Sequence, residues 1–140
     1  MGTILDDLYD HEGYALRRLP DGTLTGTWTH ATREFTAYVA GCDCGWRGTH
    51  PYPPTEEGWE LAVEAWRKEH AEPELDRQAE RRRGELARVL EWLGAQADRL
   101  EDPATMQRVA RGVDRAHRLV ADMQRDLERH TAGREADGGR

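Results

Sequence analysis

The first 50 residues alternate polar and apolar positions with the period of two that is typical of β-strands. In residues 23–30 threonine occupies every odd position. Residues 14–19 lead into this stretch through the turn signal Pro20-Asp21-Gly22, and residues 35–41 follow it after a short turn. The pattern predicts a three-stranded antiparallel sheet whose strands lie side by side in chain order.

From Thr55 the period changes to that of a helix. Thr55 is a suitable N-cap, and Glu56 and Glu57 would lie in a first turn where the helix dipole favours acids. We expect this helix to cover the sheet, and Pro73 either to end it or to start the next helix. One stripe carries Trp59, Ala62, Val63, Trp66 and His70, and the predicted core is Trp28, Phe35, Val39, Trp59, Val63 and Trp66.

Residues 73–132 carry two apolar stripes with spacings of three and four, which predicts an antiparallel helical hairpin. Asp102 and Pro103 provide an N-cap and a first helical residue for the second helix. The first stripe is Leu75, Ala79, Leu86, Val89, Leu90, Leu93, Ala97 and Leu100; the second is Met106, Val109, Val113, Ala116, Val120, Met123 and Leu127.

These patterns predict an α+β protein in three parts. Residues 1–72 form a small sheet-and-helix domain, 73–132 form the hairpin, and 133–140 form a disordered tail. Two helices alone bury one face each, so the hairpin must cover its apolar side in another way. We expect it to fold onto the small domain, to form a homodimer, or to hold another protein.

Charge is distributed unevenly. Residues 1–73 hold six cations against thirteen acids, whereas residues 74–131 hold twelve of each. An acidic first half repels phosphate backbones and disfavours nucleic acid as a partner. Arg81, Arg82 and Arg83 would be the candidate contacts if the hairpin bound nucleic acid, although acids are interleaved with them. Without a leader pattern or a membrane-length apolar run, we expect a cytoplasmic protein.

The two cysteines of the chain, Cys42 and Cys44, stand in Gly41-Cys-Asp-Cys-Gly45. Short cysteine spacing followed by glycine suits zinc, which prefers four thiolate or imidazole ligands. His70 would face the sheet from the last turn of the predicted helix. In a chain-order sheet, His11 and His30 fall roughly 25 Å from Cys42, at about 3.3 Å per strand residue. His50 then remains as the fourth ligand.

The predicted metal ligands are therefore Cys42, Cys44, His50 and His70, holding a structural Zn²⁺. Asp43, Glu69 or water are substitutes for His50, and a water ligand would make the site catalytic. Two further interpretations stay open: a redox or catalytic cysteine pair, or an ordinary turn beside a helix that ends in His70.

The motif Cys42-x-Cys-Gly-Trp46, followed by a helix closing in Trp66-x-x-x-His70, resembles a recurring class of small proteins from actinobacteria and their phages and mobile elements. The resemblance covers about residues 28–73. It implies a zinc-finger-like fold and carries no activity with it.

The sequence thus favours a non-enzymatic, zinc-stabilised adaptor or regulator that acts through protein contacts of its hairpin. One alternative is a nucleic-acid-binding regulator of a phage or mobile element. Another is a metal-dependent enzyme with an open zinc site.

Overall fold

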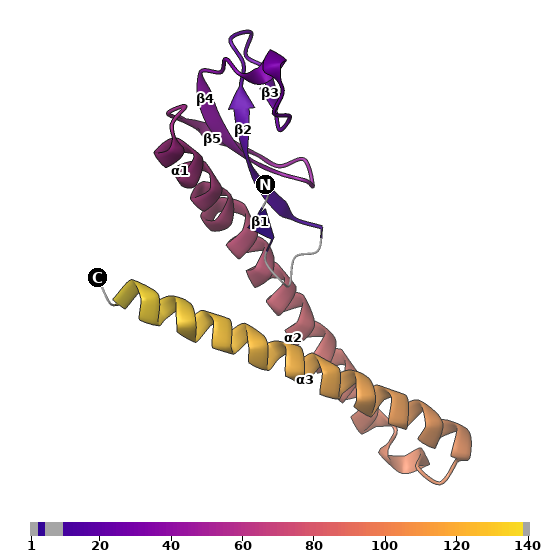
Figure 1. Ribbon diagram of the computed structural model, residues 1–140. Coiled ribbons are helices and arrows are strands. Elements are labelled where there is room, and N and C mark those ends of the chain that lie inside the picture. The colour runs from indigo at the N-terminus through magenta and orange to yellow at the C-terminus, as the bar shows by residue number, and fades with distance from the viewer. Residues whose placement is uncertain (1–2, 5–9, 139–140) are drawn as a thin grey trace. The chain divides into compact units, whose positions relative to one another are not determined.

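The computed structural model describes residues 3–4 and 10–138, and it confirms the predicted α+β class (Figure 1). The chain divides into two compact units, Met1–Asp76 and Arg77–Arg140. We call them the small domain and the hairpin unit. The division falls within one long helix, since α2 runs from Glu72 to Ala95.

The small domain contains an antiparallel sheet with five strands among the described residues. The strands β1, β2, β4 and β5 lie side by side in that order, and the short β3 also pairs with β2. In the central pair, Gly13 lies opposite Cys42 and Arg18 opposite Ala37. The bounds are β1 Thr3–Ile4, β2 Glu12–Arg18, β3 Leu24–Thr25, β4 Ala37–Cys42 and β5 Arg47–Tyr52.

The sheet does not follow chain order, and this corrects the predicted meander. The expected second strand at residues 23–29 shrinks to Leu24–Thr25, so β2 pairs directly with β4. Threonine hydroxyls explain the change. They form hydrogen bonds with nearby backbone groups, which in a strand would bond to the neighbouring strand instead. The Thr32 hydroxyl donates to the Thr27 carbonyl at 2.6 Å and accepts from the Thr29 amide at 2.8 Å.

One other prediction for this region was wrong, and one strand was not predicted. Trp28 is 59% exposed rather than part of the core, and the Arg17 guanidinium lies over its ring at 3.9 Å. The strand β5 was missed because its sequence has no alternation of apolar residues, and four of its six residues are exposed. Pro51 is compatible with such an edge strand, where one missing N–H costs little.

The first helix, α1 (Glu56–Trp66), begins where predicted. The Thr55 side chain accepts a hydrogen bond from the Gly58 amide at 3.1 Å, and two glutamates occupy the first turn. α1 packs on β2, β4 and β5 (Figure 1). One core cluster is Ala40, Cys42, Ala65, Trp66, Ala71 and Leu75; the other is Ala15, Tyr38 and Ala62, with Phe35, Trp59 and Val63 packed against it.

The helix does not end at Pro73. A π-helical turn, Arg67–Ala71, joins α1 to α2, and in it the Glu72 amide donates to the Arg67 carbonyl five residues back. The wider turn makes room for proline, which has no N–H to give to Glu69. It also adds one residue to the inward stripe, so that both His70 and Ala71 are buried.

The hairpin unit pairs α2 with α3 (Pro103–Gly138). As predicted, Asp102 caps α3: its carboxylate accepts from the Thr105 amide at 3.2 Å and from the Thr105 hydroxyl at 2.7 Å. α3 extends beyond Ala132, where we expected the tail to begin, and residues 139–140 lie outside the described residues.

The contacts between α2 and α3 form a seam that agrees with the predicted stripe on α2 at Ala79, Leu86, Val89 and Leu93. On α3 the prediction was right in part: Val109, Ala116 and Met123 are half-buried, whereas Met106, Val113, Val120 and Leu127 are exposed. Arg82 donates to Asp126 at 2.8 Å, Arg115 to Glu85 at 2.7 Å, and Gly112 lies close to Leu93. The α3 residues buried in this seam are Thr105, Leu119 and Asp126, and hydropathy singled out none of them. Because polar residues occupy several of these positions, the apolar pattern alone did not show which residues of α3 face α2.

Candidate metal centre

The two cysteines lie on the tight turn that joins β4 to β5. The Gly45 amide donates to the Cys42 carbonyl at 3.0 Å, and the Cys42 amide donates to the Trp46 carbonyl at 3.0 Å. Gly45 has φ +100°, which a residue with a side chain rarely adopts. The turn buries the Cys42 side chain and leaves Cys44 exposed.

The start of β2 runs beside this turn. The Asp43 amide donates to the Glu12 carbonyl at 3.0 Å, and Gly13 lies opposite Cys42 in the sheet. His11 immediately precedes β2, so this pairing places its ring next to the cysteines. The Cys42 Sγ lies 3.6 Å from His11 Nδ1.

The π-helical turn supplies the other histidine. His70 is 9% exposed, and its Nε2 lies 3.3 Å from Cys44 Sγ. The Trp46 ring stacks on the imidazole with centroids 4.8 Å apart and planes 13° from parallel. Stacking from one side restricts the ring and holds Nε2 toward the sulfurs.

The four side chains His11, Cys42, Cys44 and His70 bring their ligand atoms within 4.8 Å of one another. His11 Nδ1 and His70 Nε2 are 3.1 Å apart. Around a tetrahedral zinc, bond lengths near 2.05 Å to nitrogen and 2.3 Å to sulfur place two nitrogens about 3.3 Å apart and nitrogen and sulfur about 3.5 Å apart. The observed separations of 3.1, 3.6 and 3.3 Å match this arrangement.

The structure therefore brings together Cys42, Cys44 and His70 from the predicted set, but His11 takes the place of His50. His50 is not part of this group of described residues. It lies on β5, and its ring contacts Tyr52 with centroids 4.7 Å apart. The assumed chain-order sheet placed His11 at the far end; direct pairing of β2 with β4 reverses that placement.

The buried indole of Trp66 bears on the state of the cysteines. Burial raises the pKa of the Cys42 thiol, while hydrogen bonds from the Cys44 amide and the Trp66 indole counteract this increase. Trp66 Nε1 is buried with no partner of regular hydrogen-bond geometry among the described residues. A metal-bound thiolate at Cys42 is a suitable acceptor for it, as in the outer shell of many metal sites.

Gly13 keeps the indole in this position. A Cβ added at Gly13 would lie 2.1 Å from Trp66 Cδ2, so only glycine lets the ring pack flat on the strand. Trp66 is fully buried and belongs to the same core cluster as Cys42. The donor cluster and the core of the small domain are thus one packed structure.

Comparison with known proteins finds no matching family model, no matching curated protein and no matching solved structure. The case for this site therefore depends on its donor atoms and their geometry.

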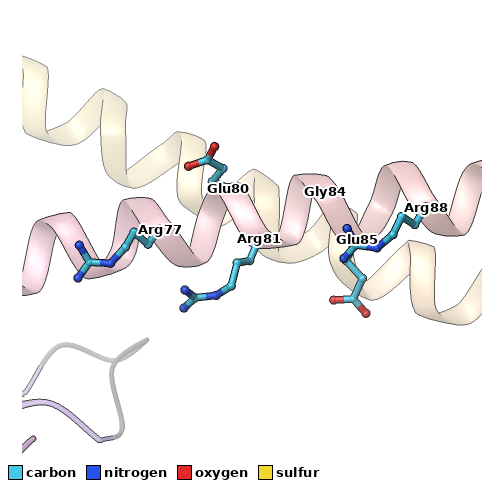
Figure 2. Close-up of a pocket in the computed structure, with 6 residues that line it drawn as sticks. All are labelled: Arg77, Glu80, Arg81, Gly84, Glu85 and Arg88. Atoms are coloured by element: carbon cyan, nitrogen blue, oxygen red, sulfur yellow. The ribbon is translucent and has the colours of Figure 1, made fainter.

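The arginines proposed for nucleic acid do not form one surface. Arg82 turns toward α3, where it pairs with Asp126 at 2.8 Å and reaches Asp122 at 4.0 Å. Figure 2 shows Arg77, Arg81 and Glu85 pointing to the same side of α2, with Glu80 pointing away. Glu85 also pairs with Arg115 at 2.6 Å. Carboxylates therefore interrupt the basic surface.

In the part of the chain that the structure describes, each helix is too short or too polar to cross a membrane.

Proposed function

We propose that His11, Cys42, Cys44 and His70 bind one structural Zn²⁺, and that the protein is a non-enzymatic adaptor whose hairpin makes the protein contacts. The observation that carries the proposal is that four donor atoms lie within 4.8 Å of one another, with three of their separations close to those of tetrahedral zinc. A two-sulfur, two-nitrogen set of this shape favours zinc over metals that prefer oxygen ligands or planar geometry.

The position of the donors supports a structural role. They come from the approach to β2, from the β4–β5 turn and from the π-helical turn, three places far apart in the sequence. An ion bound there would link both central strands to the helix, and its binding free energy would become folding free energy.

The number of protein donors favours a closed site. Catalytic zinc usually has three protein ligands and one position for water or substrate. Here the fourth position has a histidine nitrogen, which supports an interpretation as structural metal rather than as an enzyme centre.

The hairpin supports the adaptor part of the proposal. Its outer surface carries large apolar side chains that are 39–68% exposed, including Leu90, Trp92 and Leu127. Exposed apolar area of this kind is typical of protein contact surfaces. The nucleic-acid alternative is less well supported, because Arg82 is paired within the hairpin and the small domain is acidic.

Zinc content measured by mass spectrometry of the purified chain tests the metal site. We expect one zinc per chain in the wild type and less than about a tenth of that in His11→Ala, because three remaining ligands hold the metal far more weakly. His50→Ala is the matched control and should retain the full content. Cobalt substitution should give the visible spectrum of tetrahedral thiolate coordination.

Full zinc retention in His11→Ala together with loss in His50→Ala would restore the sequence-based ligand set and overturn this one. Zinc below stoichiometry in the wild type, after refolding with excess metal, would contradict the metal site altogether.

A further inference from the structure

The hairpin unit has little core of its own. Among its described residues, those that are buried are Ala79, Thr105, Leu119 and Asp126, and two of the four are polar. Asp126 is buried through its pair with Arg82 rather than through apolar contacts. Half-buried apolar residues add to this core, namely Leu86, Val89, Leu93, Val109, Ala116 and Met123. A unit of this length would still gain stability from burying more apolar surface.

Such apolar surface is present on α3, but outside the seam. Met106, Val113, Val120 and Leu127 repeat every seven residues and are 42–68% exposed. Each directly follows a seam residue: Thr105, Gly112, Leu119 and Asp126. A seven-residue repeat keeps side chains in one row along a helix. The row is therefore a second apolar stripe parallel to the one that contacts α2.

Charges are excluded from the neighbourhood of this row. The adjacent outer row is Ala110, His117, Gln124 and Thr131, so the eight positions contain no Asp, Glu, Lys or Arg. We call these two rows the uncharged face. The remaining positions of α3 over the same length, outside the apolar seam and the uncharged face, are Gln107, Arg108, Arg111, Asp114, Arg115, Arg118, Ala121, Asp122, Arg125, Glu128 and Arg129, of which all but two are charged.

The helix α2 contributes to the same side. In an antiparallel pair, residues that follow the seam on one helix face residues that follow it on the other. Leu90 holds such a position on α2 and is 54% exposed, and Arg83, seven residues earlier, holds another. The opposite side of the seam is charged instead, as the Arg115–Glu85 pair shows. Trp92, seven residues after Glu85, is 39% exposed on that side, so most but not all exposed apolar side chains lie on the side of the uncharged face.

We propose that a second copy of this chain covers the uncharged face, so that two hairpins form a four-helix bundle. This inference rests on the proposed function, in which the hairpin makes the protein contacts, and it names the partner. A twofold contact places the same patch on both sides. The uncharged face suits that symmetry, because it brings no like charges together.

Stabilisation by a constant partner also favours self-association. The hairpin has few fully buried residues, so a cover that is present whenever the chain folds would stabilise it. A second copy is always available at the same concentration. A heptad-spaced stripe on antiparallel helices is the surface from which four-helix bundles are built.

Light scattering and sedimentation equilibrium of the full chain test this proposal. The wild type should have twice the 16.0 kDa chain mass. Val113→Glu with Val120→Glu should raise the dimer dissociation constant by at least about 100-fold, because the contact would bury four unpaired carboxylates. The matched control is Gln107→Glu with Ala121→Glu, which adds the same charge to α3 outside the face and should remain a dimer.

A wild-type monomer at micromolar concentration would overturn the proposal, as would a control variant that dissociates as readily as the face variant. If the face variant does not fold, the wild type still decides the question: its thermal midpoint, followed by circular dichroism, must rise with protein concentration. Zinc content is measured on the same samples. A zinc-loaded monomer would refute only the dimer, and a zinc-free dimer would refute only the metal site.

Discussion

The small domain and the hairpin unit are of similar length but are built in different ways. The small domain surrounds Trp66 with a buried cluster that reaches the donor group of His11, Cys42, Cys44 and His70. The hairpin unit buries four of its described residues and presents a row of apolar side chains outward. Short units often need a metal or a partner to supplement a small core. For this chain we propose a metal for the small domain and a second copy of the chain for the hairpin unit.

Metal removal should produce the largest difference in stability between the two units. With structural zinc contributing about 10 kcal/mol in small domains, we expect a strong chelator to unfold the small domain. The near-ultraviolet circular dichroism of the buried Trp66 should disappear, while most helical signal at 222 nm from the hairpin remains. A parallel loss of both signals would contradict the independence of the two units.

A glycine-to-alanine pair tests the difference in packing. Gly13→Ala should destabilise the small domain by about 3 kcal/mol, because its Cβ would overlap the buried Trp66 ring. Gly94→Ala is the counterpart in the hairpin unit, where the added Cβ meets no atom within 4 Å. It should stabilise α2 by about 0.5–1 kcal/mol. Chemical denaturation of each variant measures its change in unfolding free energy. Equal changes in the two variants would contradict the proposed difference in packing between the units.

Breaking the ion pair in the hairpin seam should give a smaller loss of stability than Gly13→Ala. Arg82→Met leaves Asp126 buried with Arg129 as its remaining partner at 3.3 Å, so we expect a loss of about 2 kcal/mol. Adding Asp126→Leu should recover most of that loss, since an apolar pair fits a buried seam. A double-mutant cycle by urea denaturation measures the coupling, and additive effects would show that the pair contributes little.

Local signals in the sequence predicted local structure well. Thr55 and Asp102 cap the helices that were expected to follow them, because capping depends on residues a few positions apart. Strand pairing depends on distant residues. The alternating threonines of residues 23–29 fit a strand, yet their hydroxyls close a loop instead. The error in sheet order followed directly from that interpretation.

The candidate site shows the same limit. Cys42, Cys44 and His70 could be predicted from spacing and helical period, and the structure brings them together. His11 could not be predicted in this way, because its position depends on which strands are neighbours in the sheet. The signal that would have found it is the direct pairing of β2 with β4, which aligns the start of one with the end of the other.

The π-helical turn has a consequence for sequence variation. Because Arg67–Ala71 contains one residue more than a regular turn, His70 and Ala71 both face inward. Deletion of a single residue there would restore a continuous α-helix, and Ala71 would take the inward place of His70. We therefore expect homologues without this histidine to lack one residue at this turn. In an alignment, that one-residue gap would mark the chains expected not to bind the metal.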